Sequence, residues 1–268
     1  MELRAYLAEY AKVWAYIKSQ ADADGITKLA EQRMYTQQPI LDTLDTLEMV
    51  YLDRKTFVPP PYEKVSKELG LFTDPVTTGK DPFFLLTGRF VLPIKDISGN
   101  VIALVGWAKD SLKYITTAAE HFSKATMFFG LENLTIPRNN GMGTFVVEGI
   151  FDRVALESLG CRTFATMGIN TDVRKNAMYS LMGRIVGVPD NDTKGREVIT
   201  KNSWTLPMGS SYFRWKGLYK GVDLNGKPFE LRIKDVDDLN KLYDHSDMRE
   251  LFADVYRDRN VRHITRLI

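Results

Sequence analysis

Acidic side chains gather in three short segments of the second half of this 268-residue sequence, at 148–152, 190–192 and 235–238. In chain order, the acids are Glu148, Asp152, Asp190, Asp192, Asp235, Asp237 and Asp238. Carboxylates held close together repel and raise one another's pKa unless a cation neutralises them. Mg²⁺ and Mn²⁺ favour oxygen ligands and are the usual partners of phosphoryl chemistry. If one edge of a sheet collects all three segments, the sequence predicts metal-dependent work on phosphates.

The spacing within each segment fits this interpretation. Asp190 and Asp192 are one residue apart, so in an extended chain both side chains lie on the same face and can share one cation. Asp152 follows Glu148 by four residues, which places it in the first turn of a following helix, where the helix dipole favours a carboxylate. An ordinary interpretation stays open for the first and third segments taken alone: Asp152 as a helix cap, Glu148 as a solvated loop residue and 235–238 as a surface loop.

Alternating strands and helices are predicted to position these acids. The predicted strands are 144–147, 163–166 and 185–188, and the predicted helices are 152–159, 171–181 and 195–203. This alternation predicts a mostly parallel sheet with helices on its faces, and such sheets place their chemistry at strand ends. Residues 204–231 break the rhythm with glycines and aromatic residues, so we expect strands or a hairpin insertion there. Residues 239–268 are predicted to be helical.

The first half of the sequence has a different pattern. Amphipathic helices are predicted over 2–18 and 40–51, and a short helix is predicted over 62–69, after a triple proline that no helix can continue. Apolar runs at 89–94 and 101–107 flank a Ser-Gly-Asn turn and predict a β-hairpin. The basic stretch beyond the hairpin is interleaved with aromatic residues, which suits a phosphate backbone or equally an ordinary solvated helical face.

The composition excludes several other classes of protein. Lysines and arginines number 36 and aspartates and glutamates number 34, so the net charge argues neither for nor against nucleic acid. The single cysteine, Cys161, excludes a disulfide framework and a cysteine-based zinc site within this sequence. No apolar run reaches the roughly 18 residues of a membrane span, so we expect a cytoplasmic protein with no membrane partner. A P-loop is disfavoured because Pro228 follows Lys227 where a Ser or Thr is required.

Three stretches resemble the signature of the Toprim domain, which bacterial-type primases, type IA and II topoisomerases and some nucleases share. They are Val147–Asp152, Asp190–Gly195 and Asp235–Asp238. Upstream stretches resemble, in the same order, elements of the catalytic core of bacterial (DnaG-like) DNA primase. These are Gly88–Ile94, the Asp96–Asn100 turn, Val101–Trp107, Lys113-Tyr114 and Phe122–Leu131. The resemblance spans residues 61–243 and favours primase among these families.

The resemblance implies an α/β fold, in which a mixed α+β primase N-terminal subdomain precedes a Toprim domain with a mostly parallel sheet flanked by helices. It divides the chain into a helical N-terminal segment (1–60), a basic primase-type subdomain (61–138), the Toprim domain (139–243) and a helical tail (244–268). The small size and the first 60 residues are similar to a bacteriophage replication protein, whose site of action would be the cytoplasm of the bacterial host.

The resemblance also implies roles for individual residues. The expected catalytic residues are Glu148, Asp190 and Asp192, and the expected ligands of Mg²⁺ or Mn²⁺ are the same three with Asp235 and Asp237. The expected supporting residues are Asp152, Gly149 and Gly195, and those expected to bind template or nucleotide are Arg89, Lys113, Tyr114 and Lys124. The implied reaction is template-directed synthesis of RNA primers on single-stranded DNA from nucleoside triphosphates, a nucleotidyl transfer that needs no protein nucleophile.

The sequence departs from such primases in two ways. They usually begin with a Cys/His zinc-binding domain and end in a helicase-binding domain or a fused helicase, and this sequence contains neither. No zinc is therefore expected, and either the chain is a minimal core or a replicative helicase and a separate zinc-binding or template-recognition protein supply these functions. The alternatives are a Toprim-family metal-dependent nuclease and a non-catalytic DNA-binding or helicase-associated replication subunit.

Overall fold

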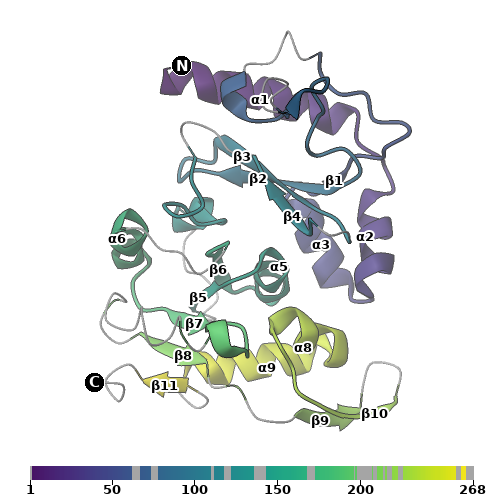
Figure 1. Ribbon diagram of the computed structural model, residues 1–268. Helices are drawn as coiled ribbons and strands as arrows, with labels where there is room; N and C mark the ends of the chain where they lie inside the picture. The colour runs from purple at the N-terminus through teal and green to yellow at the C-terminus, as the bar shows by residue number, and fades with distance from the viewer. Residues whose placement is uncertain are drawn as a thin grey trace. The chain divides into compact units, whose positions relative to one another are not determined.

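The two larger β-sheets of the described residues organise the chain, one in each of two compact units (Figure 1). The first unit is Met1–Thr36 with Leu44–Ser123, and the second is Gln37–Thr43 with Lys124–Ile268. The computed structural model describes residues 2–61, 67–73, 78–109, 112–117, 122–135, 143–167, 173–195, 197, 207, 210–213, 215, 219–222, 226–257 and 261–263. The domain limits expected at residues 60, 138 and 243 stay predictions.

The first unit contains a four-stranded antiparallel sheet with the strand order β1-β2-β3-β4. Its strands are β1 (Val50–Tyr51), β2 (Phe90–Lys95), β3 (Val101–Trp107) and β4 (Tyr114–Thr116). The central pair is the predicted hairpin, which is confirmed. Asp96 closes its turn, because its Oδ1 accepts hydrogen bonds from the backbone N–H groups of Ser98 and Asn100, at 2.8 and 2.9 Å.

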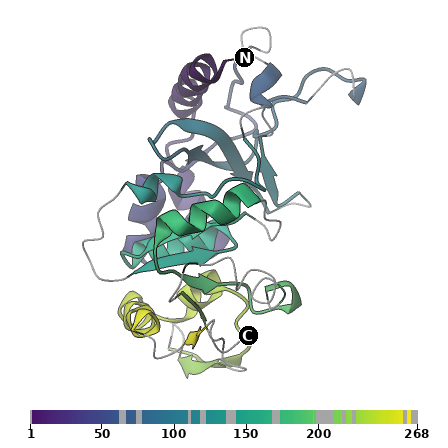
Figure 2. The ribbon, with the colours of Figure 1, turned by 90° about the vertical axis from the view of Figure 1, so that its left-hand side faces the viewer.

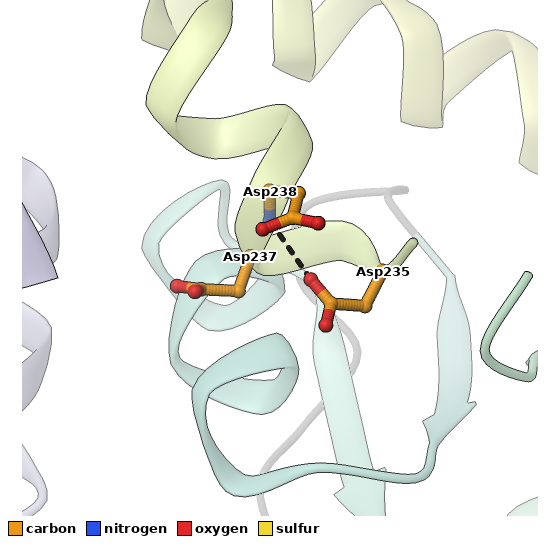
Figure 3. Close-up of side chains that lie close together, drawn as sticks. All are labelled: Asp235, Asp237 and Asp238. Atoms are coloured by element: carbon orange, nitrogen blue, oxygen red, sulfur yellow. Dashed lines mark hydrogen bonds between the residues drawn. The ribbon is translucent and has the colours of Figure 1, made fainter. Parts of the chain in front are cut away.

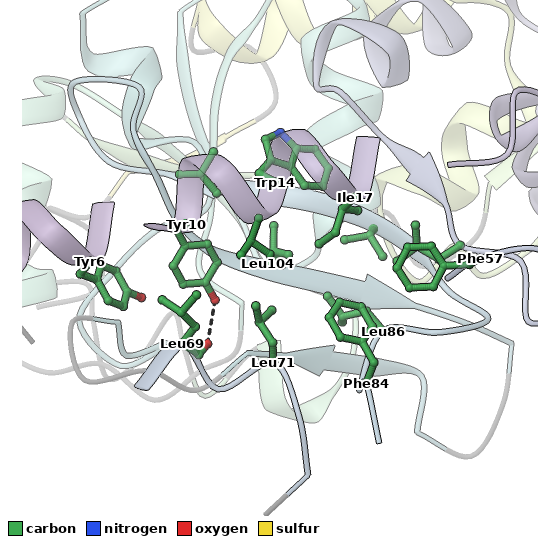
Figure 4. Close-up of a cluster of buried hydrophobic side chains, with 14 residues drawn as sticks. Tyr6, Tyr10, Trp14, Ile17, Phe57, Leu69, Leu71, Phe84, Leu86 and Leu104 are labelled. Carbon is green, nitrogen blue, oxygen red and sulfur yellow. Dashed lines mark hydrogen bonds between the residues drawn. The ribbon is translucent and has the colours of Figure 1, made fainter. Parts of the chain in front are cut away.

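Helix α1 (Leu3–Ser19) covers this sheet with its aromatic face, as Figure 4 shows. Tyr6 and Tyr10 are completely buried, and Trp14 packs in the same apolar cluster. The Tyr6 hydroxyl donates to the carbonyl of Ile102 at 2.5 Å, and the Tyr10 hydroxyl donates to the carbonyl of Leu69 at 2.9 Å. The predicted first helix is therefore confirmed, and its aromatic residues form the core.

The predicted second helix was too long, and one helix was missed. Helix α3 (Gln38–Thr46) ends five residues early, because Glu48 adopts a left-handed φ of 57° and Val50–Tyr51 pairs with β2 as β1. The missed helix is α2 (Gly25–Arg33). Its first residue is a glycine, a residue type that usually marks a turn between elements rather than the start of a helix. In the predicted helix over 62–69, residues 62–66 lie outside the described part, and η2 (Lys67–Leu69) is a single 3₁₀ turn.

The second unit contains a five-stranded, mostly parallel sheet with the order β11-β8-β7-β5-β6. Its strands are β5 (Thr144–Val147), β6 (Arg162–Ala165), β7 (Val186–Val188), β8 (Ser211–Phe213) and β11 (Val261–His263). All neighbouring pairs are parallel except β11–β8, which is antiparallel at one edge. The parallel order predicted from the alternating strands and helices is therefore confirmed.

Helices cover both faces of this sheet (Figures 1 and 2). They are α5 (Ile150–Ser158), α6 (Val173–Met182), α8 (Val236–Leu242) and α9 (His245–Tyr256), with the 3₁₀ turn η3 (Leu131–Leu134). Val146 of β5 belongs to an apolar cluster with Tyr179 and Met182 of α6, whereas the ring of its neighbour Phe145 lies 5.6 Å from that of Phe252 in α9. Successive strand residues point to opposite faces, so α6 and α9 lie on opposite sides.

The C-terminal part differs from the predicted helix over 239–268. Helix α8 ends at Leu242, and Asp244 starts α9 as a new N-cap, because its Oδ1 accepts from the backbone N–H of Asp247 at 2.8 Å. The three residues of β11 then pair with β8, so the expected helical tail contains a strand. The three residues Val261–His263 are too few to show the apolar alternation from which a strand is predicted.

The remaining predictions for the second unit fall into two groups. The expected hairpin within 204–231 is confirmed by β9 (Tyr219–Val222) and β10 (Pro228–Leu231), which pair antiparallel. Residues 198–203, most of the helix predicted over 195–203, lie outside the described part. Among the described residues, no helix combines the length and the hydropathy of a membrane-spanning segment.

Candidate functional site

The first two acidic segments meet at the edge of the parallel sheet formed by the carboxyl-terminal ends of its strands. Strands β5 and β7 are neighbours, with Val147 paired to Val188, so both chains leave the sheet at the same edge. Glu148 directly follows β5, and Asp190 follows β7 after one proline. The backbone N–H of Asp190 donates to Oε1 of Glu148 at 3.1 Å. The side chain that follows β5 is thus hydrogen-bonded to the backbone that follows β7.

The third segment is joined to the second through Asn191. The backbone N–H of Asn191 donates to the carbonyl of Lys234 at 2.6 Å, and the side-chain Nδ2 of Asn191 donates to the carbonyl of Ile233 at 2.8 Å. The Lys234 ammonium in turn lies 3.0 Å from Oδ2 of Asp190. Backbone and side chain therefore hold the segment that precedes α8 beside the loop that follows β7.

The third segment is also joined to the first, through Asp152. This side chain is buried in the first turn of α5, and its Oδ1 accepts a hydrogen bond from the backbone N–H of Asp237 at 3.0 Å. The N-cap position of α5 is Gly149, which makes no side-chain cap. Asp152 is therefore a link between α5 and α8. All three acidic segments predicted from the sequence are connected pairwise.

The acids of the third segment surround the start of α8 (Figure 3). Asp235 is the N-cap of this helix, because its Oδ1 accepts from the backbone N–H of Asp238 at 2.9 Å. One carboxylate oxygen from each of Asp235, Asp237 and Asp238 lies within 4.8 Å of the others, a spacing that could hold a metal ion. The carboxylate of Asp237 also contacts the ammonium of Lys241, at 2.6 Å. Asp238 was not among the ligands expected from the sequence, although it stands in the same acidic run.

The environment of three of these carboxylates, Glu148, Asp152 and Asp235, opposes their ionisation. Burial raises the pKa of Glu148, and the neighbouring Asp190 raises it further. Burial also raises the pKa of Asp152 well above its usual value, with contributions from Asp235 and Asp237. Burial and the neighbouring Asp238 raise the pKa of Asp235 to about 6. The hydrogen bonds of the site therefore hold together partly buried acids whose carboxylates repel one another.

This donor set fits a hard divalent cation. Each of the seven acids of the three segments offers carboxylate oxygens as metal ligands. In the described part of the chain, the ammonium groups that pair with these carboxylates belong to Lys234 and Lys241. Carboxylate oxygens are the ligands that Mg²⁺ and Mn²⁺ favour, and an excess of negative charge needs such an ion. The residues present therefore fit the metal that the sequence predicts.

Two glycines allow the close approach of these segments. A Cβ on Gly149 would lie 2.5 Å from Oδ2 of Asp152, and a Cβ on Gly195 would lie 1.9 Å from the backbone carbonyl oxygen of Asp190. Both distances are shorter than a carbon and an oxygen tolerate. The backbone N–H of Gly195 also donates to Oδ1 of Asp192 at 2.9 Å, which fixes that carboxylate in the loop. The supporting roles proposed for both glycines thus have a steric reason.

No family model matches the sequence, and no curated protein matches it either. Solved structures do match. The RNA polymerase domain of Mycobacterium tuberculosis primase DnaG aligns with a TM-score of 0.68 and 19% identity, over 94% of this chain and 84% of that chain. The zinc-binding and RNA polymerase domains of Aquifex aeolicus primase align with a TM-score of 0.67 and 20% identity, over 93% of this chain and 60% of that chain.

A DnaG primase catalytic domain bound to single-stranded DNA aligns with a TM-score of 0.64 and 17% identity, over 96% of this chain and 80% of that chain. The chain has the fold of a DnaG primase catalytic core. The expected fold class is therefore confirmed: a mostly parallel sheet flanked by helices follows a mixed α+β part. At these identities the likeness establishes the primase fold, so activity has to be argued from the residues themselves.

The primase fold distributes the expected template-binding residues over both units. In the first unit, Arg89 is 6% exposed, and its Nη1 donates to the carbonyl of Leu112 at 2.8 Å. Next to that carbonyl, Lys113 and Tyr114 are both exposed, and the ammonium lies 5.5 Å from the centre of the ring. Lys124 belongs to the second unit and is exposed. Arg89 thus supports the loop that carries Lys113, and a direct contact of any of the four with template stays a prediction.

Metal binding should depend on pH in the range where Asp235 titrates. A carboxylate must be deprotonated to bind a cation, and the pKa of Asp235 in the metal-free fold is about 6. We expect the Mg²⁺ affinity to fall as the pH is lowered through 6, by at least about tenfold for each pH unit well below 6, because protons on Asp235 and on Glu148, whose pKa is also raised, compete with the ion. Titration calorimetry between pH 7.5 and 5 measures this, and an affinity that stays constant down to pH 5 would contradict it.

Proposed function

We propose that this chain is a DNA primase catalytic core, a primase-type RNA polymerase that makes short RNA primers on single-stranded DNA during DNA replication. The observation that carries the proposal is the convergence of three acidic segments at one edge of the parallel sheet, in a chain with the primase fold. The fold alone does not require these acids, whereas nucleotidyl transfer does.

The metal ligands we propose are Glu148, Asp190, Asp192, Asp235 and Asp237. When bound, Mg²⁺ or Mn²⁺ stabilises the attacking 3′-oxygen and the leaving pyrophosphate of the reaction. The chain's own contribution is positioning. The hydrogen bond from the Asp190 backbone orients Glu148, and the buried bond between Asp152 and the Asp237 backbone fixes the start of α8 against α5.

We propose that the template is single-stranded DNA and that the substrates are nucleoside triphosphates. The similar DnaG catalytic domain was solved with single-stranded DNA bound, which supports this partner. On this chain, an exposed ammonium at Lys113 beside the exposed ring of Tyr114 suits a phosphate next to an unpaired base. A replicative helicase and a separate zinc-binding or template-recognition protein are further proposed partners. The reaction would take place in the cytoplasm.

The product made on single-stranded DNA tests this proposal. The chain is incubated with circular single-stranded DNA, labelled ribonucleoside triphosphates and Mg²⁺ or Mn²⁺, and the products are resolved by size before and after alkali treatment. We expect short alkali-labile products, an intact template, and loss of synthesis on addition of a chelator. Fragmentation of the template without RNA synthesis would contradict the proposal in favour of a nuclease.

A template that already carries a short RNA primer is the matched control for initiation. If a template-recognition partner is needed only to start a primer, the chain will extend this one while leaving the bare circle unused. Failure on both templates, with a folded chain and both metals tried, would contradict the proposed activity and favour a non-catalytic replication subunit.

A further inference from the structure

Lys234 lies between the second and third acidic segments, in the loop that joins β10 to α8. Its ammonium is 3.0 Å from Oδ2 of Asp190 and 4.0 Å from Oδ2 of Asp235. Its backbone is held in place, because its carbonyl accepts from the backbone N–H of Asn191 at 2.6 Å. The fold thus places one cation beside carboxylates that come from two different parts of the chain.

The other lysine in the cluster is held differently. Lys241 lies on α8, one turn after Asp237, and its ammonium contacts the Oδ2 atom of that acid at 2.6 Å. Its side chain is 21% exposed and the carboxylate of Asp237 is 4% exposed, so this pair is largely enclosed. The side chain of Lys234 is 56% exposed. Lys234 can therefore withdraw into solvent by side-chain rotation alone, whereas Lys241 is part of the packed helix.

We propose that Lys234 is an exchangeable counter-ion of the metal centre: its ammonium neutralises Asp190 and Asp235 in the metal-free chain, and it leaves when a divalent cation binds these carboxylates. The inference rests on the proposed function, which requires a metal at this cluster. The ammonium lies beside the carboxylate oxygens that a shared metal ion needs, and a lysine ammonium and a divalent ion placed at the same two carboxylates repel each other.

The charges of the site explain why such a residue is useful. Without a cation, Asp190 and Asp235 would repel each other and Glu148, which would push the loops at the sheet edge apart. A lysine at this position keeps the acids together before the metal arrives. A lysine whose side chain is more than half exposed is held only weakly by its ion pairs, so a divalent ion with several oxygen ligands can displace it. Lys234 is in this sense a positioning residue, which prepares the site at the cost of some metal affinity.

The proposal predicts that loss of Lys234 tightens metal binding. We expect Lys234→Met to bind Mn²⁺ about two- to tenfold more tightly than the wild type, because a competing cation is removed from a weak, exposed pair. Mn²⁺ binding is measured on the full chain by electron paramagnetic resonance of the free ion. Lys234→Arg keeps the positive charge and should stay close to the wild-type affinity.

Lys220→Met is the matched control, because it removes the same charge from an exposed lysine that pairs with Glu230 at 2.8 Å in the β9–β10 hairpin. It should leave Mn²⁺ affinity unchanged. A second readout is the melting temperature: metal-free Lys234→Met should melt below the wild type, and saturating Mn²⁺ should close the gap. If the wild type binds Mn²⁺ and Lys234→Met binds it equally or more weakly, the exchange is wrong while the proposed function stands. If the wild type binds no Mn²⁺, both are wrong.

Discussion

Asp190→Asn is expected to lower primer synthesis by at least about a hundredfold while leaving the chain folded. Replacing groups that only orient metal ligands already costs about 10- to 100-fold, so loss of a ligand should cost no less. Asparagine has the same shape and keeps the backbone N–H that donates to Glu148. The substitution therefore removes a charge from the centre of the cluster without removing the bond between the two strand ends. Synthesis on a primed template measures the effect.

Glu250→Gln provides the control, because it removes one carboxylate from an exposed position on α9 and should leave synthesis unchanged. Circular dichroism of both variants shows whether the fold is retained. Wild-type synthesis by a folded Asp190→Asn chain would mean that the acids at the sheet edge do not form the catalytic centre.

The second large effect concerns stability. Arg153 of α5 is 1% exposed, and it pairs through Nη2 with Glu132 at 2.9 Å and through Nε with Glu157 at 2.8 Å. Its guanidinium also lies 4.1 Å from the centre of the Phe129 ring. Arg153→Met would leave two enclosed carboxylates without their cation, so we expect the free energy of unfolding to fall by about 3–5 kcal/mol. The midpoint of urea unfolding measures this loss.

Arg249→Met is the matched control, because this arginine is exposed on α9 and its removal should change the free energy of unfolding by less than about 0.5 kcal/mol. If Arg153→Met lost less than about 1 kcal/mol at an unchanged urea slope, the three charges would not form a buried unit. The expected result matters for the site, because Arg153 directly follows Asp152 and packs η3 against the helix that carries that acid.

Local sequence patterns predicted most strands correctly. The β2–β3 hairpin and the parallel strands β5 and β7 are largely apolar runs bounded by glycines or polar turns, and such runs need no distant partner to be recognised. The missed elements lack this signal. Helix α2 begins at Gly25, where a Cβ would lie 3.0 Å from the backbone of Tyr51, so a glycine required by packing resembled a break. The strand β11 has only three residues, too few to show an alternation, and it is recognised by its antiparallel pairing with β8.

The candidate site could be predicted as a set of acids but not as a set of contacts. Parallel strands imply that Glu148 and Asp190 share an edge of the sheet, whereas the order that makes β5 and β7 neighbours is a property of the whole fold. The role of Asp152 was open for the same reason, because its partner is a backbone N–H 85 residues away. The sequence did not indicate a functional role for Lys234, since a lysine beside an acidic run is common.

Arg89 shows a different limit of prediction. An arginine that frames an apolar strand resembles a basic surface residue, and the sequence indicates no partner that would enclose it. The structure buries it, and Gly106 on the neighbouring strand makes the room, since a Cβ there would lie 2.9 Å from Cδ of Arg89. Burial of a long cationic side chain thus depended on a glycine 17 positions away.

The central claim, that one metal centre joins the three acidic segments, is tested most directly by locating bound Mn²⁺ in crystals of the chain through its anomalous diffraction. The account predicts an ion in contact with carboxylate oxygens of Glu148 and Asp190, with Asp235 or Asp237 completing the set from the third segment. A chain that makes primers while its Mn²⁺ lies away from Glu148 and Asp190 would contradict the account.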